Sequence, residues 1–267
     1  MKVFLSGLES SEKNIIDELI QKGEKVDYIL SSYYYLRKKP HLIDKLKLIS
    51  TQILIDSGAH SFQKGKKVSW KEYTTEYSNW IKENDSQQIL GYFEMDIDNV
   101  IGYGEVLKLR NQLEKVSNNI IPVWHKNRGI EEFKKMCKQY KYIAITGFKN
   151  EDIKDNQYLM FLKYAKQHKC KVHCLGMTRL KILNKIPFDS VDSSTWKQAG
   201  NFGEYRKFQN GRLKIFNQRK KFTTEYLDKQ NFYEFVKLQK YYKYKWKSFK
   251  KQFAISCLKK LRRAINE

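Results

Sequence analysis

The stretch Phe188-Asp189-Ser190-Val191-Asp192-Ser193-Ser194-Thr195-Trp196 places two carboxylates within and beside a short apolar run. We expect it to form a buried strand that carries Asp192 to its C-terminal end, followed by small polar residues and Trp196. Strand interiors disfavour Asp, and an ionised carboxylate is rarely buried without a partner. A functional site would account for Asp192. The alternative is that the two acids cap a helix or form a turn after the strand.

Seven other apolar or β-branched segments of similar length come before this stretch. Apolar residues at helical spacing lie between some of them and predict helices over residues 12–22, 69–82 and 104–116. Strands that alternate with helices are typical of a parallel sheet, and eight such units predict a closed (β/α)8 TIM barrel. The other expected strands cover residues 3–7, 26–32, 53–56, 89–96, 120–125, 142–147 and 171–176.

Acidic, histidine and glycine residues fall at or just beyond the C-terminal ends of these strands. In a TIM barrel those ends lie on one rim, where the active site is built from the loops that follow the strands. Each residue alone is a common strand terminator or turn former. Their shared position makes them the candidate site: Asp56, Asp96, His125, Gly147, Gly176 and Asp192.

We expect residues 1–215 to form the barrel domain and residues 216–267 to form a basic, aromatic-rich helical extension packed on it. Beyond Tyr226, basic residues are interleaved with aromatic ones and no strand pattern is present. Such a segment can pair with phosphates and stack on bases. It can also lay its aromatic rings against the barrel and expose its lysines. We expect most of the rings to pack, with the lysines still available to phosphates.

The chain has 52 lysines and arginines against 29 acidic residues, a net charge of +23. A charge of this size attracts polyanions and gives salt-dependent phosphate binding, so nucleic acid is the first partner to consider. Frequent use of lysine in an AT-rich genome is the alternative explanation. The mean hydropathy is −0.70, no run of about 18 apolar residues is present to span a bilayer, and the first residues are apolar too briefly for a signal peptide. We therefore expect a cytoplasmic protein with no membrane partner.

The four cysteines, Cys137, Cys170, Cys174 and Cys257, contain no CxxC pair and are expected to be reduced thiols. The segment from Cys170 to Cys174 also holds His173. On a strand, alternation would point His173 and Cys174 to opposite faces, so we expect no metal site there.

Several rim segments resemble, in order and approximate spacing, the tRNA-guanine transglycosylase superfamily. The resemblance covers roughly residues 50 to 200, and its more specific parts are the Asp-Ser-Gly element and the strand with paired aspartates. The short length and divergent motifs are most similar to the phage and bacterial branch, the 7-deazaguanine DNA transglycosylases. The matching segments are Asp56-Ser57-Gly58-Ala59 with Phe62-Gln63, Phe93-Glu94-Met95-Asp96, Ile145-Thr146-Gly147-Phe148, Leu175-Gly176-Met177 and Phe188-Asp189-Ser190-Val191-Asp192.

The resemblance implies an enzyme that exchanges guanine in a nucleic acid for a 7-deazaguanine of the preQ0 or preQ1 kind without breaking the backbone. Asp192 would be the nucleophile, because a carboxylate can stabilise an oxocarbenium-like C1′ or bond to it. Asp56 would be the general acid and base that protonates the departing guanine and deprotonates the incoming base. Asp96 would accept hydrogen bonds from the base, and no cofactor is implied.

Further contacts are expected from residues close to these acids. Asp98 is the alternative to Asp96 for recognition of the base. A glycine turn can offer a backbone group at close range to the base. Tyr92 and Trp196 are the candidates for stacking on the base. The additional base contacts are Ser57, Gly58, His125, Gly147 and Gly176, and the expected nucleic-acid contacts are Trp196 and Lys197.

Two departures from the tRNA enzymes bear on the substrate. Ala59 stands where they have a second glycine and is followed by His60, so the loop is expected to hold the base differently. No cluster of Cys and His follows Asp192, where they carry a zinc site, and this favours DNA as the polymer. A base inside a duplex is out of reach, so the reaction requires a flipped or single-stranded nucleotide. The superfamily also implies a homodimer, and its phage branch implies restriction evasion in the host cytoplasm.

Three other hypotheses remain open. The chain can be a base exchanger that acts on tRNA. It can be a metal-dependent hydrolase that uses His60, His125 and His173 with rim aspartates, although no HxH pair follows the first strand. It can also be a non-catalytic nucleic-acid-binding barrel, against which the presence of both Asp56 and Asp192 argues.

Overall fold

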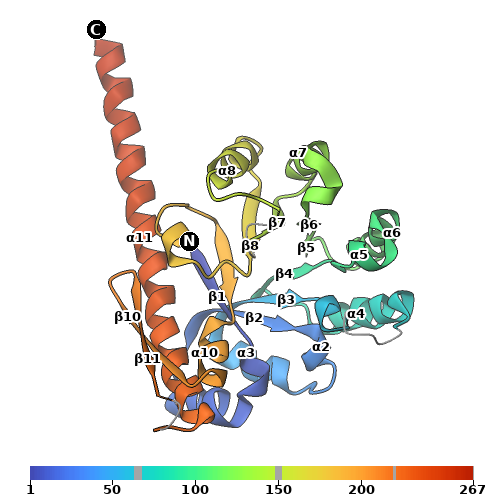
Figure 1. The fold of residues 1–267 in the computed structure, drawn as a ribbon. Coiled ribbons are helices and arrows are strands. Elements are labelled where there is room, and N and C mark those ends of the chain that lie inside the picture. The colour runs from blue at the N-terminus through green and yellow to red at the C-terminus, as the bar shows by residue number, and fades with distance from the viewer. Residues whose placement is uncertain (63–67, 148–151, 219–220, 267) are drawn as a thin grey trace.

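The computed structural model describes residues 1–62, 68–147, 152–218 and 221–266, and their side chains except those of His60 and residues 248–266. Parallel strands form one sheet whose order is β5-β4-β3-β2-β1-β9-β8-β7-β6. The sheet curls into a nearly closed α/β barrel, close to a TIM barrel (Figure 1). Its strands are β1 (Lys2–Ser6), β2 (Val26–Ser32), β3 (Ser50–Asp56), β4 (Ile89–Phe93), β5 (Ile120–Ile121), β6 (Val123–Trp124), β7 (Tyr142–Thr146), β8 (Lys171–Leu175) and β9 (Ser190–Ser193).

The expected strand over residues 120–125 is split at Pro122 into β5 and β6. Proline has no N–H to donate to a neighbouring strand, so it interrupts the hydrogen-bond ladder. β5 pairs with β4, and β6 pairs with β7. The N–H of Val123 donates instead to the carboxylate of Glu94, at 2.7 Å. The expectation of parallel strands in an α/β barrel is confirmed, and the seam at Pro122 is where closure is incomplete.

Strand alternation creates two apolar layers. Side chains on the inner face fill the barrel, so the interior is a packed core. Side chains on the outer face, such as Ile53 and Ile143, pack under the helices. The inner layer consists of Phe4, Tyr28, Leu30, Leu54, Phe93, Ile121, Val123 and Ala144.

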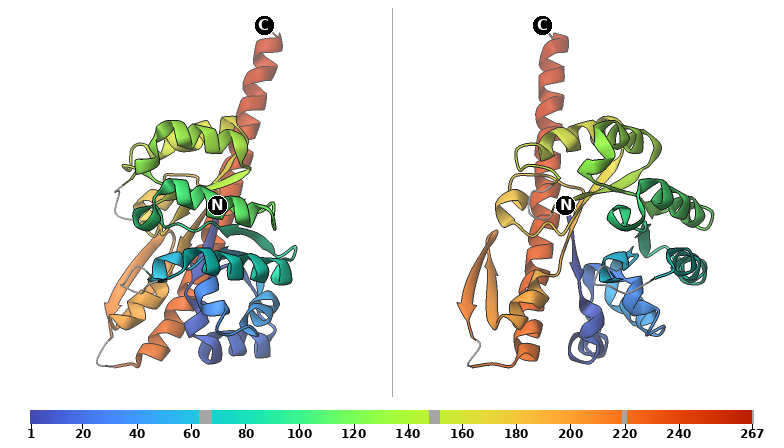
Figure 2. Two further views of the ribbon diagram at one scale, coloured as in Figure 1. Left: turned by 90° about the vertical axis from the view of Figure 1, so that its right-hand side faces the viewer. Right: turned by 45° about the vertical axis from the view of Figure 1, so that its right-hand side comes forward.

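Helices surround the barrel on its outside (Figures 1 and 2). None of the described helices combines the length and apolar composition that spanning a membrane requires. The three helices expected from sequence are confirmed as η2 (Glu12–Ile16) continuing into α1 (Asp17–Lys22), α4 (Trp70–Asn84) and α6 (Tyr103–Glu114). The others before residue 202 are η1 (Leu8–Ser10), α2 (Tyr33–Leu36), α3 (Leu42–Ile49), η3 (Ala59–Phe62), α5 (Asp98–Ile101), η4 (Lys126–Arg128), α7 (Gly129–Gln139), α8 (Tyr158–Gln167), α9 (Leu180–Leu183) and α10 (Thr195–Asn201).

A hairpin that we did not expect lies between the barrel and the last helix. It consists of the antiparallel strands β10 (Glu204–Gln209) and β11 (Arg212–Asn217). Its two-residue turn, Asn210 and Gly211, has positive φ angles of 48° and 77°. The division that we expected between residues 215 and 216 therefore falls inside a strand.

The last helix, α11 (Thr224–Asn266), packs its first half against β1 and α10 and extends beyond the barrel at its C-terminal end (Figure 2). Gln239 is fully buried and donates to the carbonyls of Val3 and Tyr28, at 2.8 Å each. It also accepts a hydrogen bond from the N–H of Asp27, at 2.9 Å. The side chain thus satisfies backbone groups of β1 and β2 that the sheet leaves unpaired.

Half of the eight described rings of α11 are buried, and two more, Tyr233 and Tyr241, are partly buried, so packing is less complete than expected. Phe232, Phe235, Tyr242 and Trp246 face the rest of the protein, whereas Tyr244 is 60% exposed. The side chain of Phe249, also expected to contribute, lies outside the described residues. Up to residue 247, where the described side chains of the helix end, its exposed lysines are Lys237, Lys240 and Lys247.

Candidate active site

Four carboxylates gather at the C-terminal end of the barrel. Asp56 ends β3, Asp192 lies in β9, Asp96 follows β4 and Glu9 lies in η1 after β1. Their negative charges act on one another, since those of Asp192, Asp96 and Glu9 all raise the pKa of Asp56. The strand ends therefore bring together the three predicted acids Asp56, Asp96 and Asp192, and Glu9 is a fourth that we did not predict.

Asp56 is held in a pocket of backbone and hydroxyl groups. Its Oδ2 accepts a hydrogen bond from the N–H of Gly58 at 2.9 Å and lies 3.4 Å from the hydroxyl of Ser32 on the neighbouring strand. Burial is the main cause that raises the pKa of Asp56 to about 6, and the neighbouring carboxylates add to it against the opposing Gly58 hydrogen bond. A carboxyl group with such a pKa can both give and take a proton near neutral pH.

The residues after Asp56 shape its loop. Gly58 has a φ angle of +75°, and a Cβ atom there would lie 2.4 Å from the Cβ of Tyr34. Ser57 is buried, and its carbonyl accepts a hydrogen bond from the hydroxyl of Tyr73 at 2.7 Å. The Gly58 N–H and the Ser57 carbonyl are both engaged within the protein. The Gly58 N–H thereby holds Asp56, whereas the Ser57 carbonyl ties the loop to Tyr73 on α4.

Asp192 has one oxygen bound and one open. Its Oδ1 accepts hydrogen bonds from the N–H of Gly176 at 2.7 Å and from Nε2 of His173 at 3.2 Å. Its Oδ2 accepts none from the part of the chain that the structure describes. The side chain is 14% exposed. Gly176, which we expected to contact the base, instead presents its N–H to Asp192.

Asp96 is joined to a second acid through His125. The ring places Nε2 2.6 Å from Asp96 and Nδ1 3.0 Å from Asp152, which also accepts a hydrogen bond from Thr146 at 2.6 Å. Burial alone would lower the pKa of His125, but the hydrogen bonds to Asp96 and Asp152 outweigh it and raise the pKa to about 9. Asp96 and His125 are thus brought together as predicted, and Asp152 is a member that we missed.

Asp98 does not share the strand face with Asp96, contrary to our expectation. It starts α5, five residues beyond the end of β4, and both its oxygens bind the guanidinium of Arg128. Arg128 also binds Glu94 at 2.8 Å, and Glu94 binds Arg110 at 2.5 Å. Both oxygens of Asp98 are thus occupied, so this carboxylate is not free to bind a base, and removal of either partner would leave an uncompensated buried charge.

Trp196 and Lys197, the residues expected to contact nucleic acid, both bind groups of the protein itself. Trp196 is fully buried against Phe232 of α11 and donates its indole N–H to the carbonyl of Ser6 at 2.9 Å. Lys197 forms an ion pair with Asp228. Trp196 is therefore closed to a base, because α10 turns its apolar side toward α11. The phosphate contact of Lys197, whose side chain is 26% exposed, stays a prediction.

Two further residues have structural roles. Tyr92 is fully buried, and its hydroxyl donates to Asp85 at 2.8 Å, so it does not stack on a base at the mouth. Gly147 donates its N–H to the carbonyl of Leu175, and a Cβ atom there would lie 2.8 Å from the sulfur of Cys174. Close packing of β7 against β8 accounts for this glycine.

The described side chains of His125 and His173 are not arranged as the metal site of the hydrolase hypothesis. Within the described residues, no group of three or more His, Cys, Asp and Glu residues is arranged to hold a metal ion. Both ring nitrogens of His125 and of His173 bind protein groups. The side chain of His60 lies outside the described residues.

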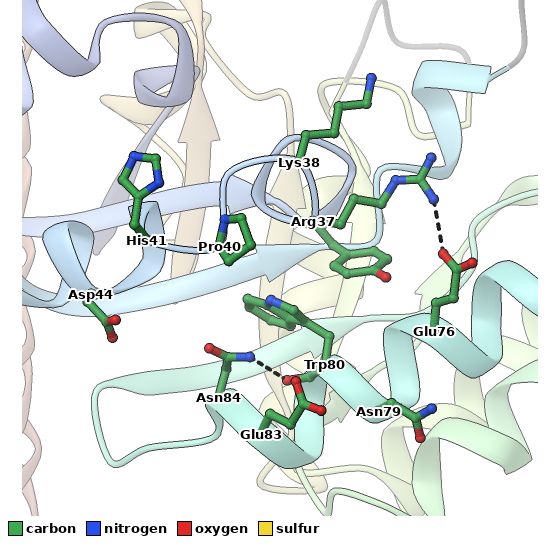
Figure 3. A pocket seen from close by; sticks show the side chains of 11 residues that line it. Arg37, Lys38, Pro40, His41, Asp44, Glu76, Asn79, Trp80, Glu83 and Asn84 are labelled. Atoms are coloured by element: carbon green, nitrogen blue, oxygen red, sulfur yellow. Dashed lines mark hydrogen bonds and ion pairs between the residues drawn. The ribbon is translucent and has the colours of Figure 1, made fainter.

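A cavity of about 860 Å³ lies away from the carboxylates, between the α2–α3 segment and α4 (Figure 3). The rings of Tyr33 and Trp80 line it, and Arg37 is paired across it with Glu76 at 3.1 Å. None of the four carboxylates at the barrel mouth borders it. Its size therefore does not identify the site of chemistry.

No protein-family model and no curated protein matches the chain. Among solved structures, one match is the crystal structure of an enolase protein from the environmental genome shotgun sequencing of the Sargasso Sea, with a TM-score of 0.43 and 10% sequence identity. The match covers 72% of this chain and 54% of that chain, so this chain spans about half the length of that structure. At this similarity, the match carries no information on activity.

Proposed function

We propose that this protein is a transglycosylase that exchanges guanine in DNA for a 7-deazaguanine, with Asp192 as nucleophile and Asp56 as general acid and base. The observation that carries the proposal is the contrast between these two carboxylates at one barrel mouth. Asp192 has one oxygen held by two N–H donors and the other open, whereas burial raises the pKa of Asp56 to about 6. Paired acids in unlike environments can divide nucleophilic and proton-transfer roles.

In the first half-reaction, Oδ2 of Asp192 bonds to C1′ as the bond between C1′ and the guanine nitrogen breaks. The guanine leaves with the bonding electrons and takes a proton from Asp56. In the second half, Asp56 takes a proton from the incoming 7-deazaguanine, whose nitrogen bonds to C1′ and expels Asp192. Both carboxyl groups end in their starting states, so the exchange needs no cofactor.

Base recognition is assigned to Asp96. Its Oδ1 is occupied by His125, which leaves the second oxygen to accept a hydrogen bond from the ring N–H or the exocyclic amine of a guanine-type base. Adenine lacks this pair of donors and would leave the carboxylate unsatisfied. Asp98 has no part in this role, since Arg128 binds it.

The charge of the chain supports a nucleic acid as the polymer. The net charge is +23, and Lys237, Lys240 and Lys247 on α11 are exposed. Lysines of this kind bind phosphates without reading sequence. DNA is preferred over tRNA because no cysteine-rich zinc segment follows Asp192.

The test is base exchange followed by mass spectrometry. Purified protein is incubated with duplex DNA, single-stranded DNA or tRNA and with preQ0 or preQ1, and the polymers are digested to nucleosides. We expect modified deoxyguanosine with wild type, none with Asp192→Asn, and unchanged product with Asp44→Asn, which alters an exposed acid on α3. Product in RNA alone would show that the assignment of DNA as the polymer is wrong, while the mechanism of exchange would stand. No product in any polymer would overturn the proposal.

A denaturing gel gives an independent readout of the covalent step. When no incoming base is supplied, wild-type protein is expected to accumulate as an adduct with the nucleic acid. Asp192→Asn should form no adduct, because an amide oxygen is a far weaker nucleophile than a carboxylate oxygen.

A further inference from the structure

A line of polar groups crosses the apolar interior of the barrel and ends at Asp192. The hydroxyl of Tyr142 on β7 is hydrogen-bonded to that of Ser190 on β9. Ser190 lies 2.7 Å from Nδ1 of His173 on β8, whose Nε2 lies 3.2 Å from Oδ1 of Asp192. We infer that His173 is a positioning residue for Asp192, and that Ser190 and Tyr142 fix the orientation of its ring. This inference rests on the proposed function, in which Asp192 attacks C1′.

The surroundings of His173 show why its contacts matter. The side chain is fully buried, and its ring packs between those of Phe4 and Phe93, with centroids 6.1 and 5.1 Å away. The titratable or polar groups bonded to this ring are Asp192 and Ser190. A buried imidazole between two phenyl rings would be costly unless both nitrogens were hydrogen-bonded.

The hydrogen bonds have one consistent direction. An ionised carboxylate only accepts, so Nε2 of His173 carries the hydrogen that Asp192 receives. In the neutral ring Nδ1 then accepts from the hydroxyl of Ser190, which in turn accepts from Tyr142. Burial raises the pKa of Tyr142 above its ordinary value, so this phenol keeps its hydrogen and remains a donor.

The consequence for Asp192 is a fixed carboxylate plane. The N–H of Gly176 and Nε2 of His173 hold the same oxygen, so Oδ2 is presented to the mouth in one orientation. Without His173, the backbone donor alone remains and the carboxylate can rotate. Misplacement of a reacting atom by about 1 Å can cost on the order of 100-fold in rate.

Tyr142, the member of this polar line farthest from Asp192, can be changed without disturbing the packed interior. Tyr142 borders a cavity of about 440 Å³ that Lys2, Lys171 and Asp189 also line, at the N-terminal end of the barrel. Tyr142→Phe removes one hydroxyl there and leaves the ring in place. Variants of Tyr142 and of His173 therefore disturb the hydrogen bonds at increasing proximity to Asp192.

The test is a comparison of kcat and KM for base exchange. His173→Phe, which matches the neighbouring rings, is expected to lower kcat by about 10- to 100-fold with KM for DNA unchanged. His173→Gln, which can still donate to Asp192, should recover part of this loss, and Tyr142→Phe should lower kcat about two- to fivefold. His168→Phe changes an exposed histidine and is the matched control. Equal kcat for His173→Phe and wild type would overturn the inference while leaving the proposed function intact.

A spectroscopic measurement tests the arrangement even if base exchange is absent. Two-bond 1H–15N correlation spectra report the tautomer of each histidine, and the signals of His173 are those missing from His173→Phe. We expect the neutral Nε2–H tautomer in wild type and a shifted Nδ1 resonance in Ser190→Ala. An Nδ1–H tautomer in wild type would overturn the inference, whereas absent exchange with the expected tautomer would overturn only the proposed function.

Discussion

The Nε2 atom of His125 lies 2.6 Å from Oδ1 of Asp96. The other ring nitrogen is bonded to Asp152, so one imidazole joins the end of β4 to the loop after β7. A pKa of about 9 makes this ring a cation at neutral pH. It thereby balances two carboxylates that would otherwise repel each other.

This cluster predicts a pH-dependent stability. The pKa of His125 is raised from 6.5 to about 9 on folding, so its stabilisation is fully present below pH 6.5 and is lost as the pH rises through about 9. Between these values, we expect the free energy of unfolding of wild type to fall by up to about 3 kcal/mol more than that of His125→Gln. Urea denaturation at several pH values measures the free energy of unfolding of both proteins. Parallel curves for the two proteins would contradict the prediction.

Asp56→Asn should separate stability from activity. The pKa of Asp56 is raised from 3.8 to about 6 on folding. The resulting destabilisation therefore grows as the pH rises from 3.8 to about 6, is fully present above about 6, and is nearly absent at pH 3.5 and below. The variant is expected to be more stable than wild type at pH 7 by about 1–2 kcal/mol, to equal it at pH 3.5, and to lack base exchange. Thermal unfolding at the two pH values and the exchange assay provide the measurements. A less stable variant at pH 7 would show that the carboxylate has a compensating partner.

Replacement of Asp98 by Asn should act mainly on stability, whereas replacement of Asp96 by Asn should act mainly on binding of the incoming base. Asp98→Asn breaks a buried pair with Arg128 and is expected to cost about 3–5 kcal/mol of unfolding free energy. Asp96→Asn removes the main cause of the raised His125 pKa, so it should lower stability below about pH 9, but by less than Asp98→Asn because Asp96 is 34% exposed. It should also raise KM for the incoming base at least about tenfold. Urea denaturation and exchange kinetics on both variants decide the matter. An unstable Asp96→Asn with unaltered KM would assign Asp96 to structure alone.

Gly58→Ala should be destabilising because the backbone has positive φ and the added methyl group meets Tyr34. A cost of about 1–3 kcal/mol is expected, together with lost activity from displacement of Asp56. The matched control is Gly104→Ala in α6, where a Cβ atom has open space and helix propensity favours alanine by about 0.5 kcal/mol or more. If both variants lowered stability equally, the strain at Gly58 would not be the cause.

Local sequence was enough to predict the barrel strands, apart from the break at Pro122, because β-branched and apolar runs bounded by turns mark them. It was also enough to place Asp56, Asp96 and Asp192 at one rim, since parallel strands of a barrel share their C-terminal end. The hairpin had a local signal too: Asn210 followed by Gly211 is a strong indicator of a two-residue turn, and we overlooked it.

Other parts of the site depend on contacts that local patterns do not encode. Alternation predicted that His173 and Cys174 point to opposite faces, but the pairing of His173 with Asp192 requires the register between β8 and β9. Asp152 follows β7 in a loop without a motif. The burial of Trp196 depends on α11 docking on α10, and the pairing of Asp98 depends on Arg128, 30 residues away.

The contact between Gln239 and the carbonyl of Val3 spans 236 residues of sequence. β1 also lies beside β9, so β1 cannot complete its hydrogen bonds until residues nearly 190 positions further along the chain have been synthesised. Contacts of such long sequence separation slow folding and leave strand edges exposed in the meantime. We therefore expect nascent chains to depend on chaperones until residue 239 emerges.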